Sequence, residues 1–218
     1  MVAVTFNHSK YGLLNKPWLP LALRCIIAFV LLDLLAYAVH RAFHAVPLLW
    51  RVHQVHHSDP DLDLSTGFRN HPLEALILQS AYLGAIVLLA PPPVAVLAVQ
   101  LAAILSAFFT HANATLPSWV DRPLRLVLVT PEMHRVHHSD QVSEQTANFA
   151  EILPWWDRLL GTYLEAPAAG QDGIRTGLQG IEDAASAGFL FMLTQPFRRA
   201  VTEAESLPNV VQSRAVGD

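Results

Sequence analysis

The chain has 218 residues, of which 52% are hydrophobic and only 15% are charged, and its formal net charge is -4. Soluble domains carry about 25% charged residues, so this composition indicates a membrane protein. The small negative charge, with no basic run and no Gly-rich phosphate loop, argues against nucleic acid as a partner. Cys25 is the only cysteine, which excludes an internal disulfide, a Cys-based zinc finger and a thiolate iron–sulfur site.

The first predicted element is an apolar helix over residues 18–39 that contains Arg24 and Asp33. About 20 residues are enough to span the hydrocarbon core of a bilayer. Asp33 costs a few kcal/mol there unless it faces protein or water, so we expect it to point inward. His40 and His44 are spaced i, i+4, which predicts that the helix continues past the membrane with both on one side.

Residues 44–71 are polar and carry the first of two HxxHH boxes, at His53, His56 and His57. In a helix, imidazoles at i, i+3 and i+4 share one face and can converge on a metal. A Ser-Asp pair follows the box, and an Asp-Pro-Asp turn signal comes next. We therefore expect a helix, a loop and a short link.

Two apolar runs, residues 73–90 and 94–109, are separated by Pro91-Pro92-Pro93. Three prolines cannot continue a helix, because each lacks the N–H and disfavours helix in the residue before it. The pattern predicts a helical hairpin that returns the chain to the membrane face it left. The first helix delivers His40 to that same face, so all histidines except His8 are predicted to lie on one side.

The predicted histidine face is rich in arginine, whereas the proline turn carries no charge. The positive-inside tendency therefore makes this face cytoplasmic. The arginines are Arg41, Arg51, Arg69, Arg122, Arg125 and Arg135.

The remaining sequence brings a second HxxHH box, at His134, His137 and His138, again followed by Ser-Asp. An amphipathic stretch at 117–129 precedes it, and an aromatic segment at 148–163 follows, with a helix end at Gly161. Residues 166–181 read as a loop and 188–193 as a short interfacial helix before a polar tail. We divide the chain into an N-terminal segment 1–17, a catalytic domain 18–165 and a C-terminal part 166–218.

Ten histidines are candidate ligands on the common face, which is too many for one ion and suits two. Spacing alone does not separate iron from zinc. His71 could instead form a supporting network with Arg69 and Glu74, and Asp59 and Asp140 are expected to orient ligands or cap helices rather than to bind metal. The candidate ligands are His40, His44, His53, His56, His57, His111, His134, His137 and His138, with His71 in reserve.

At these residues the chain resembles the membrane-bound fatty acid hydroxylase and sterol desaturase superfamily. The likeness covers about residues 18–165 and includes the boxes at 40–44, 53–57 and 134–138. Further similar features are Arg69-Asn70-His71-Pro72-Leu73-Glu74, His111-Ala112-Asn113, Trp156-Asp157-Arg158 and Gly161-Thr162-Tyr163. The resemblance adds Asn113 and Asn148 to Asp59 and Asp140 as residues that support the ligands.

The resemblance implies an all-α integral membrane bundle, with one long helix and a proline-turned helical hairpin under a cytoplasmic, histidine-rich helical cap. It implies a di-iron oxygenase that uses O2 and two electrons to hydroxylate or desaturate a lipid, although zinc can occupy such a site in purified protein. Since no flavin, haem or iron–sulfur motif is visible in the sequence, we expect a separate reductase, cytochrome or ferredoxin as electron donor.

Two alternatives stay open. A membrane protein that binds or transports zinc without redox chemistry would need ionisable residues along its spans, and only Arg24 and Asp33 qualify. An inactive, shortened family member is the other alternative, because 17 residues precede the first box helix where relatives carry further membrane helices, and because Thr110 stands where relatives often have histidine. The sequence leaves open the substrate, the choice between hydroxylation and desaturation, the electron donor and the oligomeric state.

Overall fold

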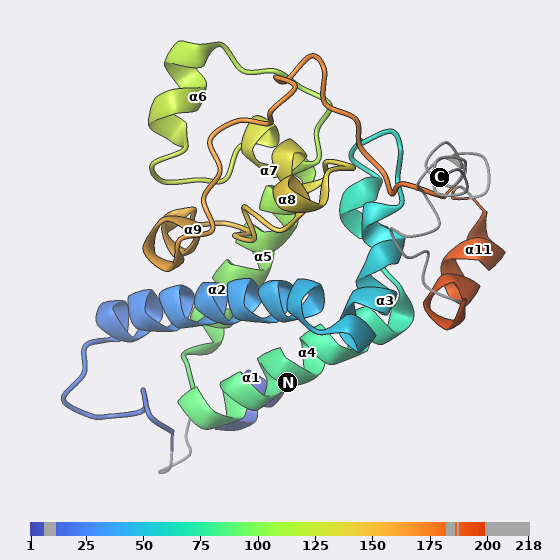
Figure 1. Ribbon diagram of the computed structural model, residues 1–218. Coiled ribbons are helices and arrows are strands. Elements are labelled where there is room, and N and C mark those ends of the chain that lie inside the picture. The colour runs from blue at the N-terminus through green and yellow to red at the C-terminus, as the bar shows by residue number, and fades with distance from the viewer. Residues whose placement is uncertain (7–11, 182–185, 187, 199–218) are drawn as a thin grey trace, which may run out of the picture.

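The computed structural model describes residues 1–6, 12–181, 186 and 188–198, and no β-strand forms in this part of the chain (Figure 1). The all-α prediction is therefore confirmed for the described residues. The α-helices are α1 Val2–Phe6, α2 Leu21–Ala45, α3 Pro47–His57, α4 Pro72–Leu89, α5 Pro93–Thr110, α6 Ser118–Leu124, α7 Pro131–His137, α8 Val142–Gln145, α9 Trp155–Leu160 and α11 Phe189–Thr194. Two 3-10 turns, η1 Thr66–Phe68 and η2 Gln195–Phe197, complete the set.

Three helices, α2, α4 and α5, are long and apolar enough to cross a membrane. The 25 residues of α2 measure about 37 Å, and the 18 residues of α4 and of α5 about 27 Å each. Their outward faces are apolar: Leu76 is 62% exposed and Leu97 is 65% exposed. Such surfaces suit contact with lipid rather than water.

The hairpin turns where the three prolines predict it. Helix α4 ends at Leu89, the next residue Ala90 has a left-handed φ of 45°, and α5 begins at Pro93. The backbone N–H of Leu14 donates to the carbonyl of Leu89 at 2.9 Å, so an N-terminal segment lies on the turn. A Cβ at Gly12 would be 2.1 Å from the Cβ of Ala90, and only glycine fits this contact.

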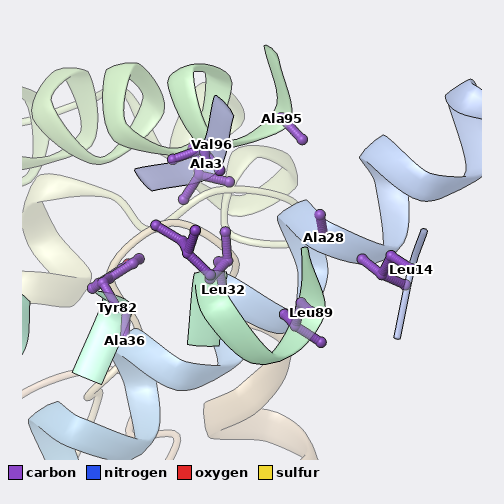
Figure 2. Packing of buried hydrophobic residues seen from close by; sticks show 11 residues of the cluster. Ala3, Leu14, Ala28, Leu32, Ala36, Tyr82, Leu89, Ala95 and Val96 are labelled. Atoms are coloured by element: carbon purple, nitrogen blue, oxygen red, sulfur yellow. The ribbon is translucent and has the colours of Figure 1, made fainter. Parts of the chain in front are cut away.

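One stripe of α2 both packs the membrane core and leads to the histidines. Ala28, Leu32 and Ala36 follow each other every four residues and are fully or almost fully buried. Figure 2 shows Leu32 among Ala3, Tyr82 and Val96, which come from α1, α4 and α5. Two further steps of four residues along the same stripe give His40 and His44.

A second cluster joins α2 to the part of the chain that carries the second histidine box. Tyr37 of α2 packs with Met133 of α7 and with Phe149. Trp156 of α9 donates its indole N–H to Asp33 Oδ2 at 2.7 Å, and Asp33 is only 1% exposed. Asp33 therefore faces protein, as its position in an apolar helix predicts, and α9 lies against the middle of α2.

Candidate metal centre

Nine histidines meet in two groups, and they are the nine that the sequence singles out most strongly. In each group, every side chain offers one ring nitrogen, and these nitrogens all lie within 4.8 Å of one another. The five-histidine group is His40, His44, His53, His57 and His137, and the four-histidine group is His56, His111, His134 and His138. Helix α2, the α3 box, the end of α5 and the α7 box all contribute.

Each HxxHH box contributes to both groups. In α3, His53 and His57 belong to the five-histidine group, whereas His56 belongs to the other. The α7 box divides the opposite way, since His137 alone joins the five-histidine group. The rings of His57 and His138 stack with centroids 4.5 Å apart, which places the two groups side by side.

Backbone carbonyls fix the protonation of two rings in the five-histidine group. His40 Nδ1 lies 2.7 Å from the carbonyl oxygen of Phe149, and His137 Nδ1 lies 2.8 Å from that of Ala147. A carbonyl oxygen can only accept, so both Nδ1 atoms carry the proton and both Nε2 atoms of the neutral rings keep a lone pair. These two Nε2 atoms are 3.0 Å apart.

The four-histidine group repeats this arrangement around His111. Its Nδ1 donates to the carbonyl oxygen of Ala107 at 2.8 Å, which leaves a lone pair on Nε2. That atom lies 3.1 Å from His134 Nε2 and 3.3 Å from His56 Nε2. Within the described residues, no outer acceptor fixes the tautomer of His134 or His56, so one of them can donate to His111 Nε2, or all three Nε2 atoms can face a cation.

The donor set fits metal ions. Two imidazole nitrogens that each lie about 2.1 Å from one ion, at a right angle, are about 3.0 Å apart, which is the observed spacing. Several other buried ring nitrogens have no hydrogen-bond partner within the described residues: His44 Nε2, His53 Nε2, His57 Nδ1 and Nε2, His56 Nδ1, His134 Nδ1 and His138 Nδ1. Coordination in the five-histidine group would satisfy Nε2 of His44, Nε2 of His53 and one ring nitrogen of His57.

Burial lowers the pKa of eight of the nine grouped imidazoles and so favours their neutral form. Desolvation lowers the pKa of His137 to about 3 and that of His111 to about 4. Burial, followed by the nearby imidazoles, also lowers the pKa of His57 and His138 well below the ordinary value of 6.5. Neutral imidazole is the form that binds a metal, so the described rings are ready for coordination at neutral pH.

A carboxylate supports one ring of the five-histidine group. Glu74, in the first turn of α4, accepts a hydrogen bond from His53 Nδ1 at 2.8 Å, and both side chains are buried. Such pairs orient a metal-binding imidazole and raise its basicity. Of the three residues expected to form a supporting network, Arg69, His71 and Glu74, it is Glu74 that lies beside a candidate ligand.

The other two members of that expected network have different contacts. Arg69 donates from Nε to the carbonyl of Val55 at 3.0 Å, near the end of α3. His71 Nδ1 accepts from the backbone N–H of Leu73 at 3.1 Å, and it therefore caps α4. His71 lies in neither histidine group.

Asn148 supports the histidine groups through hydrogen bonds to the backbone. It is fully buried with a φ of 54°, and its amide nitrogen donates to the carbonyls of Met133 at 3.0 Å and Leu164 at 2.9 Å. Its chain neighbours, Ala147 and Phe149, supply the carbonyls that hold His137 and His40. Asn148 therefore fixes the loop that orients two candidate ligands.

The other predicted supports lie away from the rings. Asp59 accepts from Thr66 Oγ1 at 2.8 Å, and Asp140 accepts from the side-chain amide of Gln141 at 2.6 Å. Asn113 is exposed. Within the described residues, none of these three is hydrogen-bonded to a histidine side chain.

Sequence reasoning missed the carbonyls of Ala107, Ala147 and Phe149, because backbone groups carry no signal in residue type. It also gave no role to Asp157, which holds the same loop. Asp157 accepts from the N–H of Phe149 at 2.8 Å and from that of Ala150 at 3.0 Å. A short polar residue within an aromatic segment was the available signal.

A cavity of about 240 Å³ adjoins both groups. Histidines from each group line it, among them His40 and His134. Leu78 of α4 and Ala103 and Ala107 of α5 also line it. The cavity thus connects the imidazoles with the two arms of the hairpin.

A helical fold with three membrane-type helices and two adjoining groups of neutral imidazoles defines a histidine-rich membrane metalloprotein. A sequence model of the fatty acid hydroxylase family matches residues 25–162, and the chain belongs to this family, within the fatty acid hydroxylase and sterol desaturase superfamily.

The chain is also similar to curated lipid-modifying enzymes. It is 33% identical over 181 residues to the ornithine lipid hydroxylase OlsE of Rhizobium tropici, covering 83% of this chain and 52% of that protein. It is 33% identical over 163 residues to the alkylglycerol monooxygenase of Homo sapiens, and 35% identical over 161 residues to that of Danio rerio. These matches cover 75% and 74% of this chain, but 35% of either relative. The chain thus spans from a third to half of these relatives' length, and no solved structure matches it.

Proposed function

We propose that the chain is a membrane-bound, O2-dependent lipid hydroxylase whose nine grouped histidines hold two iron ions. The observation that carries the proposal is the convergence of Nε2 atoms at 3.0 to 3.3 Å in two adjoining groups, with a lone pair fixed on those of His40, His137 and His111. The family supports it, as do relatives named for hydroxylation of ornithine lipid and oxidation of alkylglycerol. Those names favour hydroxylation over desaturation.

Iron suits this chemistry better than zinc. Side-chain acid–base groups are too weak to break an unactivated C–H bond, so a redox-active cofactor must supply the reactivity. Iron, when bound, provides a change of oxidation state that zinc cannot. The protein's own contribution is to hold neutral rings in place through Glu74 and the carbonyls of Ala107, Ala147 and Phe149, and to bury them away from bulk water.

The lipid reaches the centre through the cavity between α4 and α5. Ala103 and Ala107 are spaced i, i+4 and line it with small side chains, which leaves room beside the histidines. The outward faces of these helices are apolar, as membrane contact requires. The apolar part of a lipid can thus stay in the bilayer while the reacting carbon approaches the imidazoles.

The remaining features of the proposal come from the sequence. Arginines outside the spans favour a cytoplasmic position for the histidine boxes, and residues 18–165 form the proposed catalytic unit. A separate protein, such as a reductase, cytochrome or ferredoxin, delivers the electrons.

Lipid mass spectrometry of a host that expresses the chain tests this function. The wild type should produce a lipid that is heavier by one oxygen atom, and His137→Ala and His138→Ala should not. Asp61→Asn, which changes an exposed carboxylate, is the matched control and should behave as the wild type. Retained lipid oxidation in both histidine variants contradicts the proposal, and a loss of two hydrogens identifies desaturation instead. Zinc in the purified protein without O2 consumption would favour the non-redox alternative.

A further inference from the structure

Glu151 lines the cavity, and its carboxyl group has no hydrogen-bond partner in the metal centre. It shares the cavity wall with His40 and His53. Its backbone is fixed, because Ser106 of α5 donates a hydrogen bond to the Glu151 carbonyl. Among the described residues, no ion pair or hydrogen bond engages its carboxyl oxygens.

Two other acidic side chains of this region are hydrogen-bonded through one oxygen each. Asp33 accepts a hydrogen bond from Trp156, and Glu74 accepts one from His53. Asp33 Oδ1 and Glu74 Oε2 have no partner within the described residues, whereas in Glu151 both carboxyl oxygens are left for a molecule in the cavity.

The surroundings of Glu151 favour a positive charge. Burial, followed by the nearby carboxyl groups of Asp33 and Glu74, raises the pKa of Glu151 to about 7. The described residues that line the cavity include no lysine or arginine. Glu151 is half-buried, and a carboxylate that is partly shielded from water and lacks a cation is unfavourable. A cationic ligand group would gain a strong, charge-assisted hydrogen bond here.

Two neutral polar groups, Asn70 and Gln79, line the same cavity, along with alanine and leucine side chains. A plain hydrocarbon chain would remove the polar groups from water without giving them hydrogen bonds, which is costly. A small polar headgroup would satisfy them, while its apolar chain contacts Leu78 and Ala103.

We propose that Glu151 binds an amine of the lipid substrate, and hence that the substrate class is a lipid with a cationic amine near the carbon that reacts. This inference rests on the proposed function, since it treats the cavity as the place where the substrate binds. Glu151 then selects and positions the substrate rather than serving as a metal ligand.

Lipid binding to the iron-loaded full chain in nanodiscs tests the inference by native mass spectrometry. The probes are an ornithine lipid, which carries a free amine, and an alkylglycerol, which carries none. Glu151→Gln keeps the shape of the side chain and removes its charge. It should weaken binding of the ornithine lipid about tenfold or more, the value of one charge-assisted hydrogen bond. Alkylglycerol binding should change less than about twofold on the same scale.

Two further variants make the result specific. Glu151→Asp keeps the negative charge and should retain the preference for the amine lipid. Asp61→Asn removes an exposed carboxylate outside the cavity and should change neither lipid's binding. Iron content is measured on each sample, so that loss of metal is not mistaken for loss of lipid binding.

The inference and the proposed function fail in different measurements. Equal binding of the ornithine lipid by the wild type and by Glu151→Gln overturns the inference, as does equal weakening of both lipids. Turnover of the two lipids is measured separately in the presence of O2 and a reductant. Oxidation of neither lipid by the iron-loaded wild type contradicts the proposed function, even where binding depends on Glu151.

Discussion

The two histidine groups differ in how many of their rings donate a hydrogen bond from Nδ1 to an acceptor outside the group. In the five-histidine group, acceptors engage the Nδ1 atoms of His40, His53 and His137. In the four-histidine group, only His111 has such an acceptor, and the Nδ1 atoms of His56, His134 and His138 have no partner within the described residues. The bond at the outer nitrogen fixes the tautomer and orientation of a ligand ring. The five-histidine group is therefore the more rigid half of the proposed centre.

This difference means that two sites built on the same helices need not be equivalent. Helices α3 and α7 serve both groups, and His57 stacks on His138 between them. The supporting acceptors come from α4, α5 and the loop around Asn148 instead. We expect the five-histidine group to bind its ion more tightly and the four-histidine group to release its ion first.

Single ligand removal should give the largest effect. His137→Ala removes a ring from the five-histidine group and His134→Ala one from the four-histidine group, and each should lower lipid oxidation by about a hundredfold or more, since an unfilled ligand position disables the centre. Iron analysis of the purified variants should find the remaining ion held more tightly in His134→Ala. Equal affinities in the two variants would break the comparison.

The next largest effect is expected from replacing Glu74, the carboxylate that accepts a hydrogen bond from His53. Glu74→Gln should lower iron affinity or activity by about 10- to 100-fold, the usual effect of removing such a support. Iron titration should place this loss in the five-histidine group, so that the difference between the two sites shrinks. Ser80→Ala, an exposed change on the same helix, serves as the control. Unchanged iron affinity in Glu74→Gln would show that the carboxylate does not support the ligand.

The loop that holds His40 and His137 offers a smaller test. Asn148→Gly permits the φ of 54° but removes the amide that bonds to Met133 and Leu164. It should lower the free energy of unfolding by about 2–3 kcal/mol. Asn148→Ala should cost more, because alanine adds backbone strain. Thermal unfolding of both variants provides the measurement, and equal stability to the wild type would contradict the role given to this side chain.

Acidification should lower the stability of the metal-free protein gradually. Burial depresses the pKa of His111 to about 4 and of His137 to about 3, whereas unfolded histidine titrates near 6.5. The unfolded chain therefore takes up protons first as the pH falls, and the stability that neutral rings provide is present above about pH 6.5 and lost below it. The Tm of the metal-free protein should fall steadily between pH 7 and pH 5. A Tm that stays constant over this range would contradict the burial of neutral imidazoles.

Local features of the sequence predicted the fold and the main site residues. The apolar lengths of α2, α4 and α5 and the proline turn are visible without tertiary information, and the i, i+4 spacing of His40 and His44 identifies one face. The division of each box between two groups depends on how α3 and α7 face each other, which no local pattern encodes. The role of His71 as a helix cap and that of Glu151 in the cavity depend on tertiary neighbours as well. Glu151 is nevertheless the one acid in the apolar run from Phe149 to Trp156.

We propose above all that nine imidazoles form two adjoining metal sites. Iron analysis with X-ray absorption spectroscopy of the iron-loaded full chain tests it most directly. We expect two irons per chain, both with imidazole nitrogen ligands, and one tightly held iron in His134→Ala. One iron or fewer per wild-type chain, or an iron environment without imidazole, would contradict it.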